Sequence, residues 1–331
     1  MKRSAVEKLL SALPEGKIGV AGDFCTDVYW DIFPEKGEVS LETGIVTTPV
    51  GCARYSPGGA GNIVANLRGI GLSSIPCCGA LGCDPFGSWM FSELNRGNAG
   101  NTAAMLQIKR PDYHTPVYCK PLLGGKEQSR IDLGNTPLTA EESAAMLTGL
   151  EKILPSLRVL IVNGQIANGI HNEYFRKHFA LLVRKYCRTI RFVFDGRAHL
   201  DAYPGATLKI NASAASMTAF GESGHTPEES GTEIMRWSQE ELVITDGENG
   251  CFVFEKSGIT HVPAIRYDGE TDTVGAGDSF TAGFSCALAA GESIVTAAQF
   301  GTLCSAVTVR MLNQTGAPTP EKLLETVPYS D

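Results

Sequence analysis

The sequence predicts an α/β fold, with a mostly parallel central sheet and helices on both faces. The main observation is a regular alternation of helical and strand patterns after residue 138. A second observation is that two strand-rich segments, roughly 28–57 and 103–133, interrupt the α/β pattern, and we expect them to pair into a small β lid. Since no linker or internal repeat divides the chain, residues 1–331 are expected to form a single domain.

The first half of the chain is expected to begin with a helix, because charged residues interrupt its short apolar stretch. A short buried strand follows at 17–22 and ends at Gly22. Residues 60–70 have helical periodicity, since Ile63, Leu67 and Ile70 fall on one face. A strand of small residues is predicted at 74–81 and a helix near 86–97.

The second half carries the regular alternation. Strands are predicted at 158–163, 190–195, 207–210 and 241–245, and a hairpin at 250–262. Helices are predicted at 139–153, 171–187, 226–237, 276–290, 292–312 and 319–327.

Composition excludes several classes of protein. The net charge of −8 argues against a nucleic-acid polymer as a partner, because neutralising phosphates needs a basic surface. Glu292, Gln299 and Arg310 interrupt the most apolar stretch, 280–312, so no membrane span is expected. Without a secretion signal, the ten cysteines are expected to be reduced thiols in the cytoplasm. Their spacing predicts no zinc site, since no C-x-x-C pair occurs.

The most informative segment is T-D-T-V-G-A-G-D-S-F-T-A-G-F at 271–284. Its small residues precede a helix, so backbone N–H groups at the positive helix end would form an anion site. Asp278 beside that site suits a base that takes a proton from a substrate hydroxyl. On spacing alone, Asp278 is equally well explained as a helix-capping acid.

Two further glycine segments carry weaker signals. P-G-G-A-G-N at 57–62 opens a helix, and the Asn62 amide would suit a sugar diol or would simply cap the helix. T-D-G-E-N-G at 245–250 follows a strand, where ligands bind in open α/β sheets, although such a segment is often a hairpin turn. Neither segment is a Walker A loop, and the chain has no dinucleotide fingerprint after its first strand.

Together, these segments resemble the ribokinase (PfkB) family of carbohydrate kinases over nearly the whole chain. P-G-G-A-G-N resembles the family's first signature, and G-A-L-G-C-D-P-F-G at 79–87 is similar to its strand-to-helix element. T-D-G-E-N-G resembles the nucleotide turn. D-T-V-G-A-G-D-S-F-T-A-G-F at 272–284 matches the second signature in full and is the most specific of the four.

The resemblance implies a ribokinase-like three-layer sandwich with a β lid, and phosphoryl transfer from ATP with Mg²⁺ to a small sugar or sugar phosphate. It makes Asp278 the base and Gly275, Ala276 and Gly277 the anion hole. It also implies a homodimer through the lid. The remaining implied residues are the sugar-binding Asp23, Asp27, Gly58, Gly59 and Asn62, the nucleotide-binding Asn211, Thr245, Gly247 and Gly250, and Asp272 and Thr273 in a loop for a monovalent cation such as K⁺.

Within the family, G-D-F-C-T-D-V-Y-W at 22–30 resembles the kinase portion of the bifunctional heptose-phosphate kinase/adenylyltransferase. The 331 residues are expected to hold the kinase portion alone. One departure concerns ATP use: the family usually has N-x-x-E after the strand near 208–211, and here Ala214 stands in the place of Glu. An acceptor that would orient the hydration shell of the metal is therefore missing.

Two alternatives to a sugar kinase remain open. The first is a catalytically weak sugar- or nucleotide-binding protein on the same fold, motivated by Ala214. The second is a nucleoside kinase, in which Tyr29, Trp30 and Phe33 would form a wall for the base. A sugar phosphate would instead need cations near the lid, for which Arg54, Lys120 and Arg130 are candidates.

Overall fold

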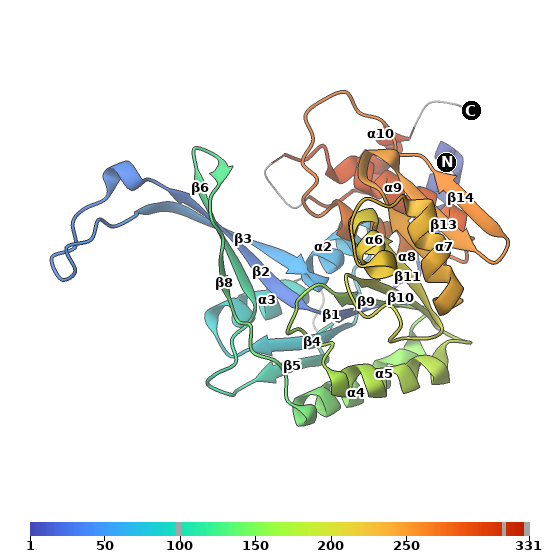
Figure 1. The fold of residues 1–331 in the computed structure, drawn as a ribbon, viewed down its shortest axis with the longest axis horizontal. Helices are drawn as coiled ribbons and strands as arrows, with labels where there is room; N and C mark the ends of the chain where they lie inside the picture. Colours follow the sequence, from blue (N-terminus) through green and yellow to red (C-terminus); the bar gives the residue numbers. More distant parts are fainter. Residues whose placement is uncertain (97–100, 313–315, 328–331) are drawn as a thin grey trace.

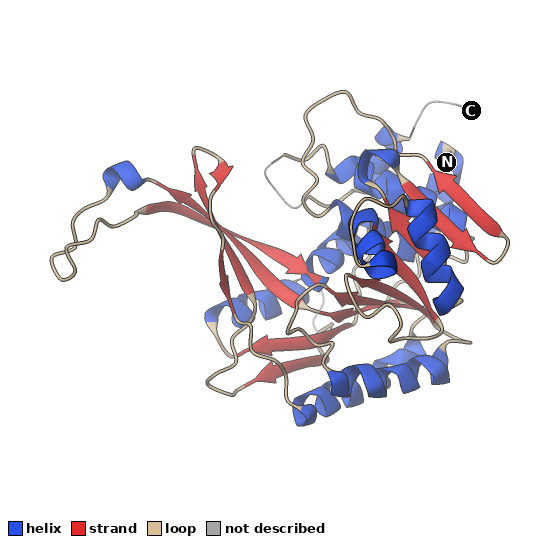
Figure 2. Ribbon diagram, in the orientation of Figure 1, coloured by secondary structure: helices blue, strands red, loops and turns tan. Residues whose placement is uncertain are grey.

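Two sheets in separate regions organise the molecule, as the computed structural model shows (Figures 1 and 2). The structure describes residues 1–96, 101–312 and 316–327. Within them the main sheet has nine strands, all neighbours from β12 to β5 being parallel, while β13 and β14 add an antiparallel hairpin. In spatial order the strands are β14 (Gly258–Val262), β13 (Cys251–Glu255), β12 (Leu242–Thr245), β11 (Ala206–Asn211), β10 (Arg191–Gly196), β9 (Val159–Gly164), β1 (Ile18–Gly22), β4 (Cys77–Gly82) and β5 (Ala104–Ile108).

Helices cover both faces of this sheet, because alternate side chains of its central strands enter two separate apolar clusters. One cluster contains Ile161 and Val193, and its helices are α1 (Arg3–Ser11), α2 (Ala60–Ile70), α3 (Pro85–Asn95), α8 (Ala276–Ala289), α9 (Ile294–Thr308) and α10 (Pro320–Thr326). The other contains Leu160 and Phe192, and its helices are α4 (Ala140–Ile153), α5 (Glu173–Tyr186), α6 (Ala212–Phe220) and α7 (Pro227–Ser238). The predicted fold class is confirmed.

Local sequence signals explain where several helices begin. Thr139 and Glu142 form a capping box at the start of α4, and Thr226 and Glu229 form one at the start of α7. The Asp84 carboxylate accepts two backbone N–H groups at the start of α3. None of the described helices combines the length and the apolar character needed to cross a bilayer.

The second sheet is the lid, which projects from the body of the molecule (Figure 1). It contains β2 (Phe24–Ile32), β3 (Val50–Gly59), β6 (Val117–Leu123), β7 (Lys126–Glu127) and β8 (Ile131–Leu133). The β2–β3 connection, residues 33–49, includes the short 3-10 helix η1 (Pro34–Lys36) and forms the far tip of the lid. Two further 3-10 helices, η2 (Leu154–Ser156) and η3 (Gly247–Asn249), lie in the body.

The two largest differences between the observed elements and the prediction concern the second lid segment and helix α6. Residues 104–108 were expected in the lid, but they form β5, which pairs in parallel with β4 in the main sheet. The second lid segment therefore begins near residue 117 rather than 103. Helix α6 was not predicted, because its run of Ala and Ser residues has no apolar periodicity.

Candidate active site

A cavity of about 1320 Å³ is lined by residues from both the lid and the main sheet. From the main sheet it includes Gly196, Asn211 and Thr245, which lie at the carboxyl ends of three adjacent parallel strands. From the lid it includes Asp27 and Arg130. Such a position, outside the carboxyl ends of the strands, is where open α/β sheets bind ligands.

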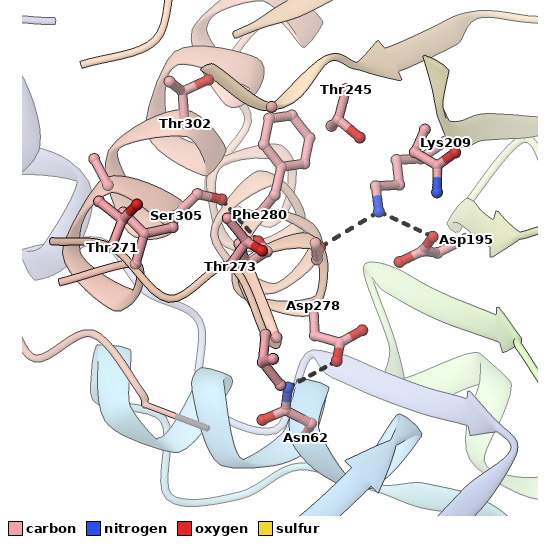
Figure 3. A pocket seen from close by; sticks show the side chains of 18 of the residues that line it. Asn62, Asp195, Lys209, Thr245, Thr271, Thr273, Asp278, Phe280, Thr302 and Ser305 are labelled. Carbon is pink, nitrogen blue, oxygen red and sulfur yellow. Dashed lines mark hydrogen bonds and ion pairs between the residues drawn. The ribbon is translucent and has the colours of Figure 1, made fainter. Parts of the chain in front are cut away.

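Asp278 lies in the first turn of α8, which begins at this cavity (Figure 3). Its carboxylate accepts two amide hydrogen bonds, one from Asn62 Nδ2 to Oδ2 (2.7 Å) and one from Gln165 Nε2 to Oδ1 (3.0 Å). Asn62 comes from α2, so the two signature segments predicted as separate parts of the site meet at this carboxylate.

The electrostatic setting of Asp278 suits a base. Burial and, next, the nearby Asp195 carboxylate raise the pKa of Asp278 to about 6, while hydrogen bonds from Asn62 and Gln165 and the charge of Lys209 act in the opposite direction. An acid with a pKa near 6 is largely ionised at pH 7 and is a stronger base than an ordinary exposed carboxylate.

The Gly275–Gly277 loop has the geometry of an anion site. Gly275 has a φ of +78°, which favours glycine, and is the residue before α8, where the first N–H groups of a helix lack acceptors within the helix. Ala276 N–H donates to Thr273 O (3.2 Å) within the turn. The N–H groups of Gly275 and Gly277 have no hydrogen-bond partner within the described part of the chain. Two of the three predicted N–H groups are thus available to an anion.

A buried ion pair lies beside this loop. Lys209 Nζ is 3.1 Å from Asp195 Oδ1 and donates to Gly277 O (3.4 Å) (Figure 3). Asp195 also accepts a hydrogen bond from Thr281 Oγ1 (2.6 Å). Thr281 lies about one helical turn after Asp278 in α8. Both charged side chains are less than a tenth exposed and both line the cavity. The pair places an ammonium group next to the predicted anion site.

Four of the five predicted sugar-binding residues line the cavity: Asp27, Gly58, Gly59 and Asn62. The glycines are required by close packing, since a Cβ on Gly58 would lie 2.7 Å from Cys25 Sγ, and one on Gly59 2.3 Å from Asp23 O. Gly59 also has a φ of +55°, which favours glycine.

Asp23, the fifth predicted sugar-binding residue, does not line the cavity and instead holds a loop. Its carboxylate accepts the backbone N–H groups of Gln165 (3.0 Å), Ile166 (2.9 Å) and Ile170 (2.7 Å). A Cβ on Gly169 would lie 2.0 Å from this carboxylate, so the loop closes tightly around it. The geometry therefore favours a structural role for Asp23 over contact with a sugar.

Cations of the lid are paired within the lid. Lys120 Nζ forms an ion pair with Asp27 (3.1 Å) and contacts the Tyr29 hydroxyl (3.3 Å). Arg130 pairs with Asp132 and stacks over the Tyr118 ring. Of the three predicted cations, Arg130 lines the cavity, whereas Arg54 and Lys120 do not.

The predicted nucleotide residues also line the cavity: Asn211, Thr245, Gly247 and Gly250. Gly247 and Gly250 have positive φ angles in the turn around η3. Asn211 caps α6 by accepting the Ala214 N–H (2.8 Å). The Ala214 side chain packs against the apolar cluster of that face.

Of the two residues predicted for a monovalent cation, only Thr273 lines the cavity. Asp272 Oδ1 accepts the Val274 N–H (3.0 Å) and so shapes the turn before α8. Asp272 N–H donates to Val309 O at the end of α9.

Among the cavity residues that were not predicted, Gln165, Asp195 and Lys209 contact Asp278 or the Gly275–Gly277 loop through polar groups or lie beside such a contact. Asp195 and Lys209 occur in F-D-G-R and K-I-N-A, where a charged residue within an apolar strand was a usable signal. Gln165 follows β9 with no motif around it, and only the long-range contact identifies it.

The sequence profile described as "pfkB family carbohydrate kinase" matches residues 36–321. Two similar proteins, each named "Bifunctional protein HldE", come from Pelobacter propionicus (24% identical, 99% of this chain and 66% of the relative) and Coxiella burnetii strain Dugway (25%, 94% and 64%). The chain thus spans slightly less than two thirds of the length of these relatives.

Solved structures agree on the fold. A ribokinase from Arabidopsis thaliana, complexed with ribose and ATP, has a TM-score of 0.71 at 16% identity and covers 96% of this chain and 100% of its own. Phosphofructokinase-2 from Escherichia coli, in complex with potassium, has a TM-score of 0.69 at 15% identity and covers 94% and 97%. The fold and the profile define the class as a carbohydrate kinase. The chain belongs to the pfkB family of carbohydrate kinases.

Proposed function

We propose that this protein transfers the γ-phosphoryl group of ATP to a hydroxyl of a small sugar or sugar phosphate, with Asp278 as the base. The observation that carries the proposal is the buried Asp278 carboxylate, which lines the cavity beside the unbonded N–H groups of Gly275 and Gly277 among the described residues. The acceptor hydroxyl would give its proton to Asp278 as its oxygen attacks the phosphorus atom. The bond to ADP would break as this bond forms, and the charge would rest on the two N–H groups.

ATP would lie along Thr245, Gly247 and Gly250, which line the cavity at and after the end of β12 in the main sheet. The oxygen donors near its phosphates suit Mg²⁺, which usually binds through one or two carboxylates, water and the phosphates themselves. Asp195 is the carboxylate beside the anion site, and it would act on the metal through water because Lys209 and Thr281 already hold it. Mg²⁺ would supply charge neutralisation on the phosphates.

Lys209 supports ATP use despite Ala214. Its ammonium group lines the cavity next to Gly277, where it would neutralise part of the phosphate charge directly. The Glu that Ala214 replaces would instead have helped to hold the Mg²⁺ ion that neutralises this charge. Thr273 and Asp272 would lie near a K⁺ ion, which is a secondary part of the proposal.

Residues at the lid side of the cavity support the choice of acceptor. Asp27 and Asn62 would bind hydroxyls, and Arg130 would bind a phosphate carried by the sugar. A nucleoside receives less support, because Tyr29, Trp30 and Phe33 are not among the lining residues of the cavity.

The lid also exposes Val50, Tyr55, Ile131 and Leu133, which would be covered in a homodimer through the lid. The ten cysteine thiols are unpaired, as in a reducing compartment such as the cytoplasm.

A sugar panel tests the proposal. ADP release would be measured with MgATP and D-ribose, D-fructose, D-mannose, fructose 6-phosphate and a heptose 7-phosphate, with and without K⁺. We expect turnover of at least one sugar. Ala214 makes a sugar-binding protein without turnover the second candidate. Saturable sugar binding by calorimetry, together with no ADP release at any Mg²⁺ concentration, would establish that candidate and reject the kinase.

A further inference from the structure

The two oxygens of Asp278 are held by amides that differ in burial and in the number of their own hydrogen bonds. Oδ2 accepts Asn62 Nδ2 at 2.7 Å and Oδ1 accepts Gln165 Nε2 at 3.0 Å. Figure 3 shows Asn62 on one oxygen and the other oxygen turned away from it. A base must lie within hydrogen-bond reach of the proton that it accepts, so one of the two amides has to share or release its oxygen when a substrate binds.

Asn62 is the fixed partner. It lies in the first turn of α2 and is only 2% exposed. One turn later, Asn66 Nδ2 donates to Asn62 O (2.8 Å) and Asn62 Oδ1 (3.2 Å). Because its own Oδ1 is held in this way, the Asn62 amide keeps its Nδ2 directed at Asp278.

Gln165 is the movable partner. It lies in the loop after β9, is half-buried and lines the cavity. Its Oε1 has no hydrogen-bond partner within the described residues, so Asp278 is the one polar contact that holds the side chain. The backbone below it is fixed by Asp23, which accepts the N–H groups of Gln165 and Ile166. The side chain can therefore turn while the loop stays in place.

We propose that Gln165 is a positioning and specificity residue that holds Asp278 Oδ1 until the acceptor hydroxyl takes that oxygen, and then binds a second hydroxyl on the adjacent carbon. This inference rests on the proposed function and narrows the acceptor to a vicinal diol. An amide offers both a donor and an acceptor, which matches a hydroxyl group. The proton of the first hydroxyl passes to Oδ1 as the oxygen–phosphorus bond forms, and Gln165 takes no part in bond making.

The ionisation of Asp278 gives the inference a readout that needs no substrate. Burial and the Asp195 carboxylate raise the pKa of Asp278, and the Gln165 hydrogen bond is one of the contacts that lower it. Removing the Gln165 amide should therefore raise this pKa further even when no substrate is present.

The first experiment compares Gln165→Met, which keeps the chain length but removes the amide, with Gln107→Met at an exposed position of β5. Ionisation of Asp278 would be followed in the ligand-free protein by infrared difference spectroscopy, with Asp278→Asn identifying its band. We expect the midpoint to rise by about half a pH unit to one unit in Gln165→Met. Gln107→Met should leave it unchanged. An unchanged midpoint in Gln165→Met overturns the inference.

The second experiment uses the best acceptor of the sugar panel and its deoxy analogue lacking the adjacent hydroxyl. The wild-type kcat/KM should favour the diol by about tenfold or more, and Gln165→Met should bring this ratio close to one. A wild-type protein that turns over no sugar rejects the proposed function. A wild-type enzyme that turns over sugars, with the same ratio in Gln165→Met, overturns only the inference.

Discussion

The body and the lid contribute to one cavity, but they are built differently. On the body side, Asp278 is buried and held by Asn62, and Lys209 and Asp195 form an ion pair within the core. On the lid side, β3 is an edge strand whose first six residues are exposed, and Leu41 at the tip has no cover at all. The difference teaches that the polar groups on the body side of the cavity are held in place before any ligand binds, whereas much of the lid surface is exposed in the isolated chain.

The largest expected effect is the loss of turnover on replacing Asp278, on the body side of the cavity. Asp278→Asn keeps the shape of the side chain but removes the base, so kcat should fall by roughly 10²- to 10⁴-fold. Steady-state kinetics on the best sugar of the panel would measure it, and circular dichroism would show that the variant is folded. Turnover within a factor of three of wild type would remove Asp278 from the mechanism.

Several elements of the body were predicted well from the sequence. Helix α2 was predicted at its observed bounds, because Ile63, Leu67 and Ile70 recur with helical spacing and form one buried face. The glycine signatures also fall at the cavity, since a backbone that approaches a ligand leaves a strong local pattern.

The parts that were not predicted depend on distant contacts. Asp23 and Asp27 look alike in the sequence, yet one holds a loop and the other lines the cavity. Gln165 reaches Asp278 across 113 positions of the chain, and β5 joins the main sheet only because β4 provides its partner. No local periodicity encodes such choices, which is why the start of the second lid segment near residue 117 and the contact of Gln165 with Asp278 came from the structure.

A second variant tests how much more the buried ion pair of the body contributes to stability than an exposed ion pair does. Lys209→Met leaves Asp195 buried without its cation and should lower the free energy of unfolding by about 3–5 kcal/mol in urea titrations. Lys185→Met, in an exposed pair with Glu151, serves as the control and should cost less than about 1 kcal/mol. The double variant Lys209→Met/Asp195→Asn should recover much of the loss. Equal losses at Lys209 and Lys185 would contradict the comparison.

The third prediction concerns pH. The pKa of Asp278 is raised from 3.8 to about 6, so the folded state keeps this proton at pH values where the unfolded chain has lost it. The stabilisation of the folded state by this bound proton is complete below pH 3.8 and is lost as the pH rises through about 6. Asp278→Asn does not titrate, so its stability relative to wild type should increase from pH 4 to pH 7 by up to about 3 kcal/mol. Denaturant titrations at both pH values would measure this, and a constant difference would contradict the raised pKa.

The smallest expected effect lies at the tip of the lid. Leu41→Ser combined with Ile45→Ser removes two apolar side chains that are 103% and 69% exposed in the isolated chain. Because they contact little within their own chain, the free energy of unfolding should change by no more than about 0.5 kcal/mol at a concentration where the protein is monomeric. Sedimentation velocity should show weaker self-association if the tip is covered by a second subunit. A loss of 2 kcal/mol or more in the monomer would mean that the tip is stabilised like the body, and the contrast between the two regions would fail.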